Sequence, residues 1–347
     1  MKIEVLKIKK NRINLEKFKV YKNQIIVSIF LTIISIFFII NSGKYINVVL
    51  DGILLYGTKI LPTLLPFFFI TNILSNFNLI YLICNQFSSL TKFLFNTKSI
   101  SAYIFFMSII SGYPMGAKLT AQFYENKLID EIDAQKILSF CSTSGPLFII
   151  GTVGIGFFHN QFIGIMLLVV HIISSIINGI IYRNFKGKNN SLNLQKNEIK
   201  NSNNIAQNLQ NFSLQNCMFN AINSVLIVGG YIIIFYVLIE IMLDYNLLFP
   251  LTKLLELLGM PMVQAKGLTS GLIEITKGIS ILSLSPNLRL NFIISSFLIS
   301  FSGISILMQA TTFLDKSGVN KKLYVLQKIT HGFIALILSI IVSLFIC

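Results

Sequence analysis

Three ionisable side chains in otherwise apolar stretches are the strongest candidates for chemistry. Lys118 follows Ser111-Gly-Tyr-Pro, and Glu274 and Lys277 follow Ser270-Gly-Leu-Ile. A charge near the middle of a bilayer costs about 2.5–3.5 kcal/mol on insertion scales, so such residues are usually functional or paired. Two interpretations stay open. Either Glu274 and Lys277 pair on one helix face, or Lys118 and Lys277 hold an anionic substrate while Glu274 is a counter-ion or carries a proton or cation.

Sequences that break helices lie close to these charges. Ser111-Gly-Tyr-Pro114 and Ser144-Gly-Pro146 contain prolines, which lack a backbone donor and bias the preceding residue away from helix. Broken helices at membrane depth are tolerated around a cavity, and they expose N-termini that suit anions. The breaks therefore predict a site for a small anionic solute, with a loop outside the membrane or a simple kink as the alternative.

The predicted substrate site combines the breaks with nearby charged, hydroxyl and amide side chains. For any single hydroxyl or amide, a hydrogen bond between helices is the competing role. The candidates are Ser111, Gly112, Lys118, Ser142, Ser144, Gly145, Glu274, Lys277, Ser302 and Gln309.

Other chemistry finds little support in the sequence. His171 and His331 are single histidines in apolar stretches without metal-ligand spacing, so packing is the predicted role. The four cysteines show no paired spacing, and no phosphate-binding glycine motif is present. We therefore expect no metal, no cofactor and no enzymatic activity.

The composition is that of a protein embedded in lipid. Of 347 residues, 54% are hydrophobic and 12% charged, and the mean hydropathy is +0.75. Soluble domains carry about 25% charged residues, and the recurring apolar runs match the ~20 residues that a helix needs to cross a bilayer. The net charge of +15 comes mainly from the N-terminal tail and the loops, which indicates the positive-inside pattern rather than nucleic-acid binding.

Loop charges and polarity divide the chain into four parts. We predict a basic cytoplasmic tail at 1–23, a first transmembrane half at 24–185, a cytoplasmic linker at 186–216 and a second transmembrane half at 217–347. The tail precedes an uncleaved first span at about 24–41, and a second span is expected at about 60–83. The linker is rich in Asn, Ser, Lys and Gln and cannot build a core.

The two halves share landmarks at nearly constant spacing. Lys277 follows Lys118 by 159 positions, and Ser302 follows Ser144 by 158. Such duplications mark many secondary transporters. Counting spans from a cytoplasmic N-terminus gives a re-entrant hairpin at about 99–129 and a broken helix at about 136–158. In the second half a hairpin at about 262–288 opens from the other side, before a broken helix at about 290–313. The predicted fold is an all-α polytopic membrane protein with an inverted repeat.

Three strings in the first half resemble the YlbJ (SpoVV) family of sporulation integral membrane proteins. They are Ser111-Gly-Tyr-Pro-Met-Gly-Ala-Lys118, Leu138-Ser-Phe-Cys-Ser-Thr-Ser-Gly-Pro-Leu-Phe-Ile-Ile-Gly151 and Leu61-Pro-Thr-Leu-Leu-Pro-Phe67. The resemblance covers roughly residues 24–345 without the linker, and is looser in the second half.

The resemblance carries expectations beyond the residues themselves. The family belongs to the nucleoside-recognition Gate group, similar in layout to concentrative nucleoside transporters. It implies transport of dipicolinate, a small aromatic dicarboxylate, across the outer forespore membrane into the developing spore. A carrier of a nucleoside-like neutral solute and a non-transporting assembly factor of the spore envelope are the alternatives. The expected partners are the lipid bilayer and an anionic small molecule, while the coupling ion and homo-oligomer formation stay open.

Overall fold

The computed structural model describes residues 25, 28–29, 31–74, 79–186, 213–315 and 317–346, and every regular element in this part is a helix. The predicted basic tail and most of the predicted linker lie outside the described residues. The first half contains a helical segment at 31–40, then α2 (Ser42–Leu55), η1 (Tyr56–Ile60), α3 (Leu61–Leu74), α4 (Leu79–Phe95), α5 (Ile100–Ser111), α6 (Met115–Glu125), α7 (Glu131–Cys141), η2 (Leu147–Phe157) and α8 (Gln161–Tyr182). The second contains α10 (Leu214–Asp244), α11 (Phe249–Leu257), α12 (Met262–Ile273), α13 (Ile275–Leu282), α14 (Leu288–Phe301), α15 (Gly303–Leu314) and α16 (Lys321–Ile346).

Between four and six of the described helical units are long and apolar enough to cross a membrane. Four are α8, α10, the pair α14–α15 and α16. Two more units are bent pairs: 31–40 with 42–58, bent by 106°, and 83–95 with 100–111, bent by 93°. The prediction of an all-helical protein with several membrane-spanning helices is therefore confirmed.

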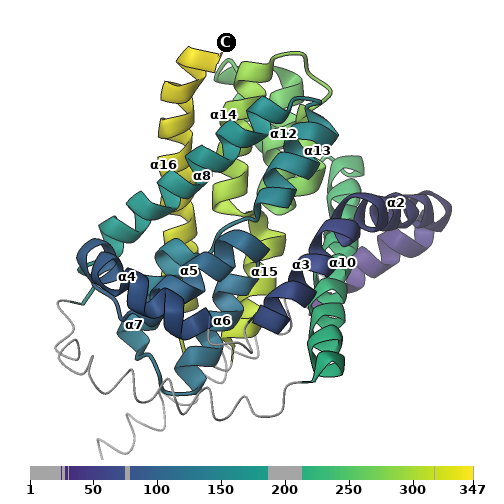
Figure 1. The fold of residues 1–347 in the computed structure, drawn as a ribbon. Coiled ribbons are helices and arrows are strands. Elements are labelled where there is room, and N and C mark those ends of the chain that lie inside the picture. The colour runs from purple at the N-terminus through teal and green to yellow at the C-terminus, as the bar shows by residue number, and fades with distance from the viewer. Residues whose placement is uncertain are drawn as a thin grey trace, which may run out of the picture.

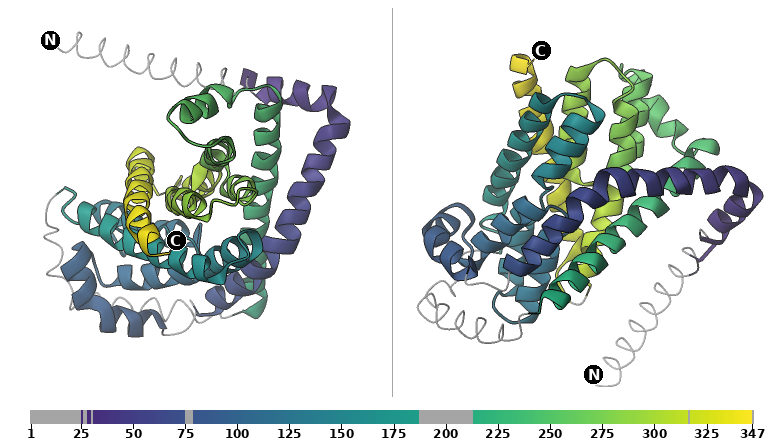
Figure 2. Two further views of the ribbon diagram at one scale, coloured as in Figure 1. Left: turned by 90° about the horizontal axis from the view of Figure 1, so that it is seen from above. Right: turned by 45° about the vertical axis from the view of Figure 1, so that its right-hand side comes forward.

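The predicted start of the second span at about residue 60 is wrong. Helix begins at Ser42 and runs through α2, η1 and α3 to Leu74. The stretch around Gly52 and Gly57 looks loop-like in the sequence, but tertiary contacts keep it helical. Gly52 lies against α10, and the hydroxyl of Tyr56 on η1 donates to the Val225 carbonyl at 2.9 Å. Figure 2 shows α2 and α10 side by side along one edge of the molecule.

Each half contains a pair of short helices joined by a tight turn, and this pair is followed by one broken helix. We call α5 and α6 the first hairpin, and α12 and α13 the second hairpin. The chain between α7 and η2 (142–145) is the first break, and Ser302 between α14 and α15 is the second break. In Figure 1 the second hairpin lies in the upper part of the molecule and the first hairpin in the lower part. Two long helices, α8 and α16, pack against each other.

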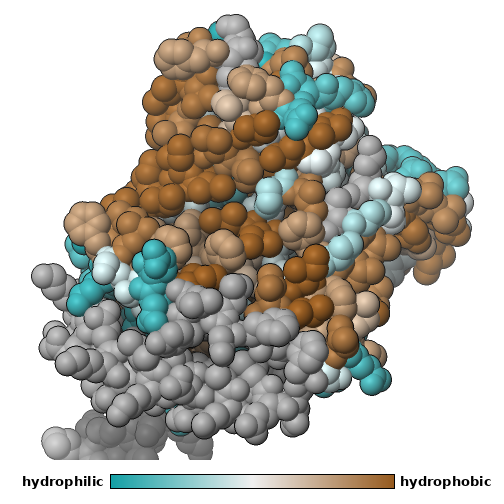
Figure 3. All heavy atoms as spheres, viewed as in Figure 1, coloured by the Kyte–Doolittle hydropathy of each residue, from teal (hydrophilic) through white to brown (hydrophobic). Residues whose placement is uncertain are grey.

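The outer surface of the bundle is apolar. Large side chains on α8 (Phe162, Val169 and Ile173) and on α16 (Phe333 and Ile337) are exposed. Figure 3 shows that apolar residues cover a broad continuous face, with polar residues gathered toward the ends and edges. A water-soluble protein rarely exposes so large an apolar area, so this face is the one that meets lipid.

Candidate solute-binding site

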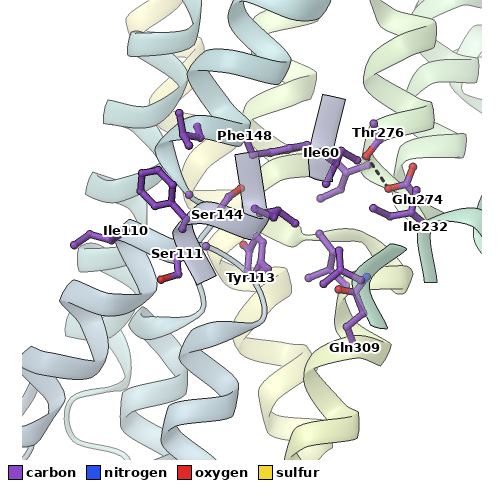
Figure 4. A pocket seen from close by; sticks show the side chains of 18 residues that line it. Ile60, Ile110, Ser111, Tyr113, Ser144, Phe148, Ile232, Glu274, Thr276 and Gln309 are labelled. Carbon is purple, nitrogen blue, oxygen red and sulfur yellow. Dashed lines mark hydrogen bonds between the residues drawn. The ribbon is translucent and has the colours of Figure 1, made fainter. Parts of the chain in front are cut away.

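A pocket lies where the two hairpin tips approach each other. It contains about 670 Å³ of empty space, part of it open to the outside. Its polar lining comes from both halves of the chain, and its apolar lining from α3, α10 and the broken helices. Figure 4 shows Ser111, Tyr113 and Ser144 on one side of this pocket and Glu274 and Thr276 on the other. The lining comprises Ile60, Leu64, Phe67, Ile110, Ser111, Gly112, Tyr113, Ser144, Gly145, Leu147, Phe148, Val228, Ile232, Glu274, Ile275, Thr276, Ile306 and Gln309.

The tip of the first hairpin packs directly on the first break. Gly112 has a φ of +75°, and a Cβ at this position would lie 2.5 Å from the backbone nitrogen of Gly145. Only glycine meets both conditions, because it adopts positive φ without strain and presents no side chain to the neighbouring backbone. The two glycines thus place the polar main chain of tip and break in contact with the pocket.

Buried side chains satisfy the backbone groups that the first break leaves without helical partners. Ser108 on α5 donates to the Cys141 carbonyl and accepts from the Thr143 backbone at 3.3 Å. The Ser144 N–H donates to Nε2 of His171 on α8 at 2.9 Å. Non-helical backbone at membrane depth requires such partners, so the break is a supported part of the fold.

The second hairpin also packs on the second break, as the first hairpin does on the first break, but different residue types make the contact. Ser302 is fully buried with a φ of +78°, a conformation that costs a non-glycine residue about 1–2 kcal/mol. A Cβ at Gly303 would lie 3.1 Å from the carbonyl oxygen of Gly271. The tip itself is Glu274, which is 2% exposed. Ser270 follows Ser111 by 159 positions, the same spacing as that of the two lysines, and this predicts a tip near Ser270. Ser270 lies inside α12, so the tip is one helical turn further along the chain.

Glu274 caps the helix that begins at the second tip. Its carboxylate accepts the backbone N–H of Lys277 at 2.7 Å and the hydroxyl of Thr276 at 3.0 Å. A carboxylate at this position satisfies free N–H groups and complements the positive end of the helix dipole. The start of α13 is therefore already occupied by a negative charge of the protein, whereas α6 and η2 begin beside the pocket without a side-chain cap.

The structure brings together some of the predicted site residues and separates others. Six of the ten line the pocket: Ser111, Gly112, Ser144, Gly145, Glu274 and Gln309. Ser142 and Ser302 lie in the two breaks just behind the lining.

The two lysines of the expected anion clamp lie outside the lining. Lys118 is half-buried and donates to the Ser224 hydroxyl on α10 at 3.2 Å. The ammonium of Lys277 lies 3.3 Å from a carboxylate oxygen of Glu240 and over the ring of Tyr236 at 4.2 Å. The partner of its side chain is thus on α10, and only its backbone contacts Glu274. Sequence spacing suggested the nearer acid, but α13 turns the lysine side chain toward α10.

Sequence reasoning missed a buried polar cluster behind the pocket wall. Lys328 on α16 is 1% exposed, and its ammonium donates to the Tyr113 hydroxyl at 2.8 Å and to the Ser142 carbonyl at 2.8 Å. Its third contact is Nδ1 of His331 at 3.2 Å. The ring of His331 stacks on that of His171, with centroids 5.0 Å apart. We call these four side chains, Tyr113, His171, Lys328 and His331, the lysine–histidine cluster.

A signal for the histidine pair was present in the sequence. His331 follows His171 by 160 positions, close to the 158 and 159 of the other landmarks. The two residues occupy corresponding helices of the two halves, α8 and α16. Lys328 gave no such signal, because no lysine stands at the corresponding position in the first half.

These features define a polytopic helical membrane protein with a pocket between two helix breaks, lined mainly by apolar residues and by a few polar groups from both halves. No model of a protein family matches the chain, and no solved structure is significantly similar to it. Among characterised proteins, the sporulation integral membrane protein YlbJ of Bacillus subtilis (strain 168) is 27% identical over 299 residues, which cover 81% of this chain and 73% of YlbJ. The chain is a homologue of YlbJ and an integral membrane protein of that sporulation type.

Proposed function

We propose that the protein is a carrier that moves a small solute across the membrane through the pocket described above. The observation that carries the proposal is that one pocket is lined by both hairpin tips, by the first break and by α15 directly after the second break. Binding sites of many transporters are built in this way, from discontinuous helices at the interface of two repeats.

The proposal includes an inverted arrangement of the two halves. In each half a hairpin is followed by a broken helix and then by one long helix, and the two hairpins lie toward opposite ends of the molecule (Figure 1). With the N-terminus in the cytoplasm, one tip would be reached from each side of the membrane. Rocking of one half against the other would then expose the pocket to the two sides in turn.

Dipicolinate is the substrate that we propose first. Its flat aromatic ring suits the apolar lining of the pocket, which includes Phe67, Phe148 and Ile232. Its carboxylates suit the uncapped beginnings of α6 and η2, whose free N–H groups and dipoles favour anions. YlbJ is a sporulation protein by name, and transport into the spore across the outer forespore membrane is consistent with that setting.

One observation favours a second candidate, a neutral nucleoside-like solute. Glu274 places a carboxylate against the pocket, and in the described part of the chain no lysine or arginine is among the residues that line it. A carboxylate can accept hydrogen bonds from hydroxyl and ring N–H groups, and an amide such as Gln309 can accept from these groups and also donate to a hydroxyl. A dianion, in contrast, would be repelled by Glu274 unless another charge compensates.

Uptake into liposomes tests the proposal. The full chain is purified, reconstituted and loaded with unlabelled dipicolinate, and exchange with labelled dipicolinate is followed against a labelled nucleoside and empty liposomes. We expect exchange of dipicolinate well above the empty-liposome level and little exchange of the nucleoside. The reverse preference would support the neutral-solute candidate, and exchange of neither would favour an assembly factor of the spore envelope.

A further inference from the structure

Lys328 occupies an unusual position for a lysine. It lies in the interior of the bundle at 1% exposure, and within the described residues no carboxylate oxygen lies within 4.0 Å of its ammonium nitrogen. Buried charges are normally paired with an opposite charge, because transfer of an isolated ammonium out of water is very costly. The Ser142 carbonyl, just past the C-terminal end of α7, offers a partial negative charge. That contact reduces the cost but leaves a full positive charge uncompensated.

The hydrogen bonds around Lys328 determine which groups carry protons. The Ser144 N–H occupies Nε2 of His171, so the proton of this neutral ring is on Nδ1 and is donated to Ser300. Nε2 of His331 lies 3.0 Å from the Ser174 hydroxyl and can donate its proton to it. Nδ1 of the same ring then carries no proton and can accept a hydrogen bond from Lys328. A charged Lys328 then has three acceptors for three donors.

The same geometry also accommodates an uncharged Lys328. A neutral amine can accept a hydrogen bond from Nδ1–H of His331, since the two nitrogens lie 3.2 Å apart, and Nε2 of that ring then accepts from the Ser174 hydroxyl. The cluster thus holds its hydrogen bonds with or without the extra proton. The other titratable groups in contact are Tyr113 from the first hairpin tip, and Tyr324 through Ser142, while α14 presents Ser300 and the Ile299 carbonyl.

The cluster is one side chain away from the pocket. Tyr113 lines the pocket, and its hydroxyl accepts from Lys328 while donating to the Ile299 carbonyl beside the second break at 3.1 Å. An anion in the pocket would stabilise the ammonium across this tyrosine, because charges interact strongly where water is excluded. The carboxylate of Glu274 lies across the pocket, and its charge repels an anion that binds there.

We propose that Lys328 is a proton-binding site whose occupancy is linked to an anion in the pocket. An anion favours the charged lysine, so its binding takes up a proton, and its release returns the proton. Since linkage is reciprocal, protonation of Lys328 raises the affinity for the anion by the same factor. The inference rests on the proposed carrier function and names its coupling ion as a proton and its substrate class as a carboxylate.

Calorimetry on the full chain in nanodiscs tests the linkage. Dipicolinate and benzoate are titrated in two buffers that differ in ionisation enthalpy, with the corresponding amides as uncharged controls. For the unaltered protein we expect uptake approaching one proton per molecule of dipicolinate or benzoate bound, because Lys328 takes up a single proton. Lys328→Met should bind carboxylates about 5- to 150-fold more weakly, the usual range of a coupling between sites, and without proton uptake. Lys328→Arg keeps a fixed charge and should bind without taking up a proton.

The matched control is Lys253→Met, because Lys253 is half-exposed and, among the described residues, its ammonium pairs with Glu256 on its own helix. Carboxylate binding without proton uptake by the unaltered protein would overturn the inference, and that measurement needs no variant. Unchanged binding by Lys328→Met would overturn it as well, and would leave Lys328 as a support for the first break. Proton-linked binding of benzoate but not of dipicolinate would keep the inference and reject the proposed substrate. If no carboxylate binds, the inference falls, and the exchange assay decides separately on transport.

Discussion

Replacing Gly116 with alanine is expected to separate the first hairpin from the first broken helix. A Cβ at Gly116 would lie 1.6 Å from the carbonyl oxygen of Cys141 and 2.7 Å from its carbonyl carbon. Both are main-chain atoms, so no side-chain rotation can relieve the overlap. Inserting atoms into a packed interior typically costs 1–3 kcal/mol and occasionally more, and here we expect the upper end, about 3 kcal/mol.

The measurement is the midpoint of thermal unfolding in detergent, together with exchange of labelled solute in liposomes. Gly151→Ala is the matched control, because Gly151 lies in η2 of the same broken helix and a Cβ there would meet nothing within 4 Å. We expect a clear fall in the midpoint and loss of exchange for Gly116→Ala only. Equal midpoints for the two variants would show that the first hairpin does not pack on the end of α7 as described.

Replacing Glu274 with glutamine should tighten the binding of an anion. The carboxylate is 2% exposed and faces the pocket (Figure 4), so it repels a dianion at short range. Glutamine removes the charge and keeps an acceptor oxygen for the Lys277 N–H, while its NH2 group can donate to the Thr276 hydroxyl that now donates to the carboxylate. A unit charge at roughly 6 Å with an effective dielectric constant of about 20 amounts to about 3 kcal/mol. Allowing for water in the pocket, we expect about 1–2 kcal/mol, or roughly 5- to 30-fold in Kd.

Glu240→Gln is the control for this experiment. Glu240 is also a partly buried glutamate near Lys277, but it pairs with that lysine on the α10 side and does not line the pocket. Dipicolinate Kd values for the two variants therefore separate a charge in the pocket from a general change of charge. Weaker dipicolinate binding in Glu274→Gln would contradict the placement of the solute. Tighter binding combined with loss of uphill uptake would assign the coupling ion to Glu274 instead of Lys328.

The breaks were predictable from sequence because their cause is local. Gly112, Pro114 and Gly145-Pro146 disfavour helix wherever they occur. In the structure the helices are interrupted at these residues. The second tip was harder to locate, since it is Glu274 and contains neither glycine nor proline. There an N-cap carboxylate and the packing of α12 on α13 end the helix.

Contacts between distant segments account for what the sequence did not reveal. The partner of Lys277 is Glu240 on another helix, and the nearer Glu274 was the natural choice from spacing alone. Lys328 follows Lys321 and Lys322 and looks like one more cation near a helix end. Its burial arises only when α16 passes beside the first break and the first hairpin tip, which no local pattern encodes.

The central claim is that one solute contacts both halves of the chain in the pocket between the two tips. Thiol protection tests it most directly. In a chain without its native cysteines, Ser144→Cys reports on the first break, Thr276→Cys on the second hairpin, and Ser89→Cys on α4 is an exposed control. Dipicolinate should slow the reaction of both pocket cysteines with a small thiol reagent, at one common half-maximal concentration, and leave the control unchanged. Transport of dipicolinate with neither pocket cysteine protected would contradict the account.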